Sequence, residues 1–186
     1  MKALLQRHDH IGIRKIESSI DRHREHDPGC FKDPVTLLRP QIGQFARALV
    51  IFDRKGCGSE ASREHIQAHV EQNLARNGWQ HRSKVIVIDP ELESWVWVRS
   101  AKVANALGWR DRYDELRAWL CDKDLWVAGT AKPRHPKVAY RAALRERGKR
   151  PSAALFGELA ANVPLHRCRC PAFNDLRETL RAWFPP

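Results

Sequence analysis

Two apolar runs rich in β-branched residues constrain the fold of this chain most strongly. They are ALVIF at 48–52 and KVIVID at 84–89. Unbroken runs of this kind are typical of strands that are covered on both faces in a parallel sheet. Between them, the stretch 59–77 carries apolar residues at helical spacing, namely Ile66, Val70 and Leu74. The pattern predicts a strand, a crossover helix and a second strand parallel to the first.

The remaining sequence predicts helices beyond the second apolar run. The segments after Asp89 show mainly helical periodicity, whereas HDPGCFKDP at 26–34 predicts a turn or loop because of its Asp-Pro and Gly residues. The predicted fold class is α/β, with a small, mostly parallel sheet flanked by helices and a helical C-terminal half. We expect a single domain over 1–186, with a sheet-containing part at 1–98 and a mainly helical part at 99–186.

The cellular compartment follows from what the sequence lacks. The N-terminus, MKALLQRHDHIGIRK, has no signal-peptide pattern, and no window approaches the roughly 20 apolar residues that cross a bilayer. We therefore expect a cytoplasmic protein without a membrane partner. The five cysteines are scattered and odd in number, which favours reduced thiols. HRCRC at 166–170 lacks the paired ligands of a structural zinc site and predicts a short extended segment with one of its two cysteines buried.

The chain is strongly basic. Lys and Arg total 33 against 22 Asp and Glu, a formal net charge of +11. Such an excess favours a polyanionic partner, above all nucleic acid, because neutralised phosphates release counterions. The alternative is a solvated basic surface, for example with Arg141 and Arg145 on the exposed face of a helix beside Glu146. The candidate nucleic-acid-binding residues are Arg54, Lys55, Lys132, Arg134 and Lys137.

Acidic residues follow both apolar runs. Asp53 and Asp89 end the two predicted strands, and the carboxyl ends of parallel strands share one edge of a sheet, where ligand sites collect. Glu91 and Glu93 follow closely. Carboxylate oxygens suit Mg²⁺, and a bound Mg²⁺ supports phosphoryl transfer. The predicted catalytic residues are Asp53, Glu91 and Glu93, and the predicted metal ligands are Asp53, Asp89 and Glu91.

Each acid also has a structural interpretation. Asp89 followed by Pro90 is a favourable start for a helix, with Asp89 as the N-cap. In such a helix Glu91 and Glu93 point apart, whereas in an extended segment they project from the same side. Asp53 can begin a turn by accepting from its own backbone, although the glycine-rich residues that follow, with Ser59 as a cap for the next helix, favour a functional role.

Several motifs resemble one protein family. IFDRKGCGSE, GWQHRSKVIVIDPELESWVW, KRPSAALFGELAANV and CRCPAFNDLRETL are similar to segments of Toprim-like proteins encoded near bacterial anti-phage operons, in particular the small fourth component of methylation-associated defence systems. The resemblance covers roughly residues 25–186. It implies a compact α/β fold with Mg²⁺-binding acids after the strands, which would be Asp53 and then Glu91 or Glu93 in this chain.

The chain departs from that family at its first acid. It has no N-terminal apolar strand ending in Glu-Gly, and Asp-Arg-Lys at 53–55 stands where an Asp-x-Asp pair is common. The chain is thus expected either to start late relative to the family or to be a degenerate member. Two functions follow: a component of an anti-phage defence system that acts as a Mg²⁺-dependent nuclease-like phosphoryl-transfer protein, or a non-catalytic subunit that binds nucleic acid or other defence subunits.

Overall fold

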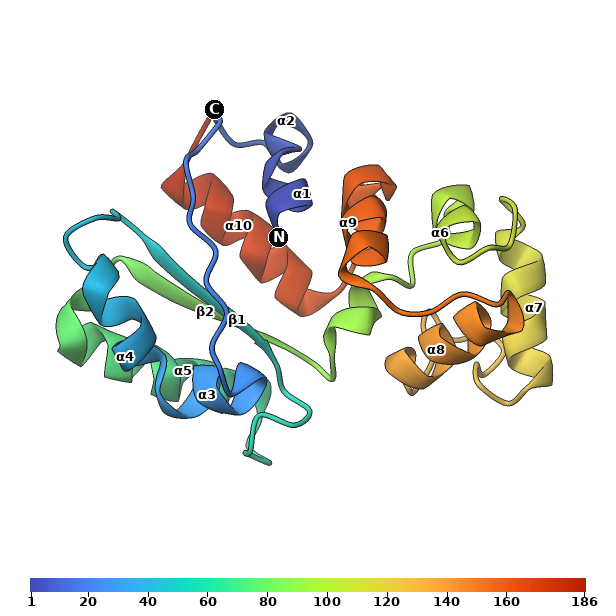
Figure 1. The fold of residues 1–186 in the computed structure, drawn as a ribbon, viewed down its shortest axis with the longest axis horizontal. Coiled ribbons are helices and arrows are strands. Elements are labelled where there is room, and N and C mark those ends of the chain that lie inside the picture. The colour runs from blue at the N-terminus through green and yellow to red at the C-terminus, as the bar shows by residue number, and fades with distance from the viewer. The chain divides into compact units, whose positions relative to one another are not determined.

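The structure is a computed structural model that describes residues 1–186, and the chain divides into two compact units. The sheet unit consists of Ser19–Leu92 and Pro171–Trp183. The helical unit consists of Met1–Ser18, Glu93–Cys170 and Phe184–Pro186. Both strands belong to the sheet unit, and no strand lies beyond residue 98 (Figure 1).

The sheet unit is built around two parallel strands. Strand β1 (Ala48–Asp53) pairs with β2 (Ser83–Ile88) in a register that runs from Ala48 opposite Ser83 to Asp53 opposite Ile88. This confirms the predicted α/β fold with a small parallel sheet. The other elements of the unit are α3 (His26–Lys32), α4 (Pro34–Leu38), η1 (Arg39–Gln41), α5 (Arg63–Leu74), η2 (Ala75–Trp79) and α10 (Pro171–Trp183).

The two strands differ in how they are covered. Helices α5 and α10 both pack against β2 (Figure 1), and every residue of β2 from Val85 to Ile88 is buried. In β1 only alternate residues are buried, namely Ala48, Val50 and Phe52. The prediction of a strand covered on both faces is therefore right for β2, whereas β1 has one fully buried face.

The crossover helix α5 begins later than predicted. Its N-cap is Ser62, whose hydroxyl accepts from the N–H of His65 at 3.2 Å. Ser59, the predicted cap, instead accepts from the N–H of Ala61 at 3.2 Å within the preceding turn. The predicted apolar face is confirmed, because Ile66, Val70 and Leu74 are buried against the sheet.

Side chains of α5 also satisfy the outer edge of β2. A two-stranded sheet leaves the alternate N–H groups of each strand without a strand partner. Gln67 Oε1 accepts from the N–H of Val87 at 3.2 Å, and Glu71 Oε1 accepts from the N–H of Val85 at 3.0 Å. The edge of the sheet is thus closed by this helix rather than by a third strand.

The helical unit has a core of tryptophan, tyrosine and leucine side chains. The indoles of Trp97, Trp109 and Trp126 are buried and donate to backbone carbonyls of Pro136, Ala143 and Thr130. No helix of the chain combines the length and the apolar character needed to cross a bilayer. The elements of this unit are α1 (Lys2–Leu5), α2 (His8–Ile11), η3 (Leu92–Trp95, which begins at the last residue of the sheet unit), α6 (Ala101–Ala106), α7 (Tyr113–Asp122), α8 (Pro136–Glu146), α9 (Ala153–Asn162) and η4 (Leu165–Arg167).

Candidate functional site

The carboxyl ends of β1 and β2 lie at one edge of the sheet, where the sequence predicted an acidic site. The loop after β1 is tied to the residues that follow β2: the N–H of Arg54 donates to Ile88 O at 2.8 Å, and the N–H of Lys55 donates to Pro90 O at 2.9 Å. Two glycines of this loop, Gly56 and Gly58, have φ of 91° and 93°, a region that side chains disfavour. The glycines therefore let the chain turn sharply after Asp53.

Asp53 organises the backbone around itself. Its Oδ1 accepts from the N–H of Leu92 at 2.8 Å, and its own N–H donates to Asp27 Oδ1 at 3.3 Å. The sequence analysis considered that Asp53 accepts a hydrogen bond from the backbone of its own turn. The carboxylate does accept from a backbone N–H, but the donor lies 39 residues away along the chain. The carboxylate of Asp53 thus joins the end of β1 to the segment after β2.

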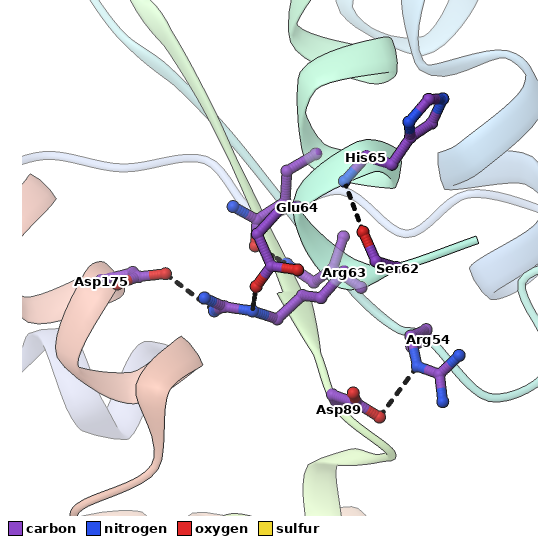
Figure 2. A network of polar contacts seen from close by, with 9 residues as sticks. Arg54, Ser62, Arg63, Glu64, His65, Asp89 and Asp175 are labelled. Atoms are coloured by element: carbon purple, nitrogen blue, oxygen red, sulfur yellow. Dashed lines mark hydrogen bonds and ion pairs between the residues drawn. The ribbon is translucent and has the colours of Figure 1, made fainter.

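Asp89 is held by a side chain rather than by a helix. Its Oδ1 lies 2.9 Å from Nε of Arg54, as Figure 2 shows, and the bond to Asp89 raises the pKa of the Arg54 guanidinium. The interpretation of Asp89 as an N-cap is wrong, because the short 3-10 helix η3 begins only at Leu92. This ion pair also places Arg54, a predicted phosphate contact, against an acid of the same unit.

The two glutamates lie in different units. Glu91 is buried and belongs to the sheet unit, as do the partly exposed Asp53 and the exposed Asp89. Glu93 belongs to the helical unit, where it is also buried and where its Oε1 lies 3.9 Å from Nζ of Lys137. The acids predicted as one site are thus divided between two bodies of the chain.

The donor set does not fit a Mg²⁺ site assembled by the protein alone. No group of three or more His, Cys, Asp or Glu side chains is gathered where it could hold a metal ion. Asp53 and Asp89 each use one oxygen for a donor of the protein, and hard cations need several oxygen ligands at once. Asp53 and Asp89 therefore each make a structural contact with another residue of the sheet unit.

A polar network that the sequence did not reveal joins α5 to α10. The Arg63 guanidinium lies between two acids, with Nη1 at 2.8 Å from Asp175 Oδ2 and Nε at 3.1 Å from Glu64 Oε1 (Figure 2). Burial lowers the pKa of Arg63, but the bonds to Asp175 and Glu64 outweigh it and leave the pKa raised. Arg63 and Asp175 are 112 residues apart, so no local pattern predicted the pair.

The excess positive charge lies almost entirely in the helical unit. That unit holds 20 Lys and Arg against 10 Asp and Glu, a formal net charge of +10. The sheet unit holds 13 against 12, a net charge of +1. Most of the excess charge thus belongs to a different unit from Asp53, Asp89 and Glu91, beside which catalysis was predicted.

The predicted basic residues divide into bound and unbound side chains. Lys132 Nζ donates to Ser94 O at 2.8 Å, and Lys137 lies near Glu93. The side chains of Arg134 and Lys55 are exposed and make no hydrogen bond or ion pair. Arg134 in the helical unit and Lys55 in the sheet unit are accordingly the predicted contacts whose side chains make no bond within the protein.

Helix α8 adds two further exposed cations. Its buried face includes Ala139 and Tyr140, while Arg141 and Arg145 lie exposed one turn apart. Neither arginine pairs with Glu146, which is also exposed. The sequence is compatible with either a solvated surface or a phosphate-binding surface at this face. In the structure, no acidic side chain pairs with its two arginines.

Comparison of this chain with protein-family models, with curated proteins and with solved structures found no match.

Proposed function

We propose that this protein binds nucleic acid through its helical unit, without cleaving it, as a subunit of a bacterial anti-phage defence system. The observation that carries the proposal is the net charge of +10 on the helical unit against +1 on the sheet unit. Solubility does not require the positive charge to be concentrated in one unit. Binding of a polyanion, in contrast, is favoured when the cations that contact it belong to the same unit. The link to defence is supported by the motif resemblance.

The exposed face of α8 supports contact with phosphates. Like charges one turn apart destabilise a helix by roughly 0.2–0.5 kcal/mol, and Arg141 and Arg145 have no acidic partner to relieve this. A phosphate backbone beside them would remove the repulsion and release counterions. Arg134, two residues before the helix, is a third exposed cation without a partner in this unit.

The strand-end acids support a non-catalytic role. Asp53 accepts from Leu92, Asp89 pairs with Arg54, and Glu93 belongs to the other unit. Each of the bonds to Asp53 and Asp89 gives the carboxylate a structural role within its own unit. The nuclease interpretation stays a prediction that the second experiment below decides.

The first experiment measures binding as a function of salt. Fluorescence anisotropy with labelled duplex DNA and labelled RNA of the same sequence should show a Kd that rises steeply with salt. The double variant Arg141→Gln/Arg145→Gln should reduce the slope of log K against log salt by about 2, since each phosphate contact contributes about 0.9. The matched control is Arg22→Gln/Arg76→Gln, which removes two exposed, unpaired arginines from the sheet unit.

Two results would overturn the binding proposal: no binding by the parent protein at low salt, or equal slope changes in both double variants. The non-catalytic part is tested separately by incubating the parent and Asp53→Ala with DNA and Mg²⁺. We expect no cleavage by either protein. Cleavage by the parent that disappears in Asp53→Ala would restore the nuclease interpretation. Phage plating on cells that carry the neighbouring genes, with and without this gene, tests the defence role.

A further inference from the structure

A basic cavity lies within the helical unit. It has a volume of about 320 Å³, and four of the eight residues that line it are basic while none is acidic. The four are Arg99, Lys132, Arg167 and Arg169. The wall includes the apolar side chains of Trp97 and Cys168, both of which are buried. An apolar wall with a few polar groups is the usual composition of a small-molecule site, and such sites start at about 300 Å³.

Two of the cations are held in place by backbone carbonyls. Lys132 Nζ donates to Ser94 O at 2.8 Å, and Arg167 Nη1 donates to Arg99 O at 3.2 Å. A lysine ammonium has three donors and a guanidinium has five, so each group keeps most of its donors for another acceptor. These bonds orient the two side chains without neutralising their charge.

The other two cations keep their charge available. Arg169 makes no hydrogen bond or ion pair within the protein. Arg99 Nη2 lies 2.9 Å from Asp114 Oδ2, but both side chains are more than two-thirds exposed, and exposed pairs of this kind contribute about 1 kcal/mol or less. Asp114 is therefore a weak competitor for an anion that enters the cavity.

We propose that this cavity binds a phosphate monoester attached to a nucleoside, either the 5′-terminal phosphate of a nucleic-acid strand or a free mononucleotide. The inference extends the proposed function, because it gives the basic unit a specific site in addition to a surface. A monoester carries close to two negative charges and matches four cations better than an internal diester with one. The apolar wall then faces the sugar or base, and a strand end enters a cavity more easily than the middle of a strand.

Calorimetric titration with two matched pairs of ligands tests the site. The first pair is one short single-stranded oligonucleotide with a 5′-phosphate or a 5′-hydroxyl, and the second is adenosine 5′-monophosphate and adenosine. We expect the phosphorylated member to bind more tightly in at least one pair. Preference in the oligonucleotide pair identifies a strand end as the ligand, and preference in the mononucleotide pair alone identifies a free nucleotide.

The variant Arg169→Gln should reduce the preference for the phosphorylated ligand about tenfold or more, because a charge-assisted hydrogen bond is lost. Arg150→Gln is the matched control: Arg150 is exposed, unpaired, in the same unit and outside the cavity. It should weaken binding of both oligonucleotides by the same factor and leave their ratio unchanged. Neither arginine is buried, so thermal unfolding should be the same in both variants.

Equal affinity within both ligand pairs would overturn the cavity proposal, as would an equal change of the ratio in the two variants. Salt-dependent binding of long duplex DNA would then persist, and the proposed function would stand without a terminal-phosphate site. Failure to bind any oligonucleotide while adenosine 5′-monophosphate binds would instead overturn the proposed function and leave the cavity as a nucleotide site.

Discussion

The closure of the sheet edge by α5 predicts a large effect of one substitution, Gln67→Ala. Gln67 Oε1 accepts from the N–H of Val87 at 3.2 Å, and both residues are buried. Since the sheet has only two strands, no third strand can take over this donor. The alanine variant leaves a backbone N–H inside the core without a partner.

The magnitude follows from the cost of that orphaned donor. A buried donor left without its acceptor costs about 1–3 kcal/mol. Alanine recovers a few tenths of a kcal/mol because it is the better helix former. We therefore expect the free energy of unfolding to fall by about 1–2.5 kcal/mol. Gln72→Ala is the control, because Gln72 lies exposed on the same helix without a partner and gains the same helix propensity.

Urea unfolding followed by far-UV circular dichroism gives the difference between the two variants. Native-state hydrogen exchange gives a second readout, since the amide of Val87 should exchange faster in Gln67→Ala and not in Gln72→Ala. If the two variants agree within about 0.5 kcal/mol, a difference typical of neutral surface positions, and the Val87 amide keeps its protection, then the side chain does not close this edge.

Two further substitutions test the helical unit. The Tyr140 hydroxyl is buried without a hydrogen-bond partner, so Tyr140→Phe should raise the free energy of unfolding by about 1 kcal/mol in urea titrations. Burial, followed by the charge of Glu93, raises the pKa of Tyr140 to about 12. Tyr140 therefore stays neutral in the folded protein at pH values where it ionises in the unfolded chain, in which its pKa is about 10. The free energy of unfolding falls as the pH rises from about 10 to 12, and Tyr140→Phe should reduce that loss. Gly108 has φ of 89°, and an added Cβ would lie 2.9 Å from Cβ of Arg147. Gly108→Ala should therefore lower the free energy of unfolding by more than about 1 kcal/mol, and the thermal midpoint should fall with it. Gly157→Ala, in a helix with open space around it, should raise the midpoint, and the same direction of change in both glycine variants would contradict this account.

The strands and the crossover helix were predictable because their signal is local. An unbroken apolar run and a four-residue apolar repeat each report directly on burial, and both β2 and the buried face of α5 follow them. The predicted start of α5 at Ser59 was wrong, because Ser62 is an equally good cap by residue type. Only the length of the turn after Gly58 decides between them.

Helix α3 shows where local signals fail. The sequence HDPGCFKDP predicted a loop, yet His26–Lys32 is helical. Pro28 lies in the first turn, where a missing N–H costs nothing. An added Cβ on Gly29 would overlap the His23 imidazole, so glycine is present for close packing rather than to break a helix. That packing partner could not be identified from composition.

The prediction for Cys168 and Cys170 was wrong for a different reason. We expected one buried and one exposed cysteine, but both are buried, because residues two apart in an extended segment lie on the same face. The intervening Arg169 is exposed and lines the basic cavity. The residues of that cavity come from three separate stretches of the chain, at 97–99, 131–132 and 167–169, so their convergence depends on tertiary packing.

The assignment of the acids and of most cations to different units bears most directly on function. A metal-dependent nuclease needs its carboxylates where the phosphate is bound, because the ion must contact both at once. In this chain Asp53, Asp89 and Glu91 belong to a unit with a net charge of +1. The unit with +10 carries the unpaired arginines of α8 and the unpaired Arg169 of the cavity. Long-range attraction of a polyanion depends on net charge, so the helical unit is the body that a nucleic acid should approach first. If substitutions in the sheet unit weaken nucleic-acid binding more than those in the helical unit, then the phosphate is bound near the strand-end acids. That result would favour a nuclease over a non-catalytic binding protein.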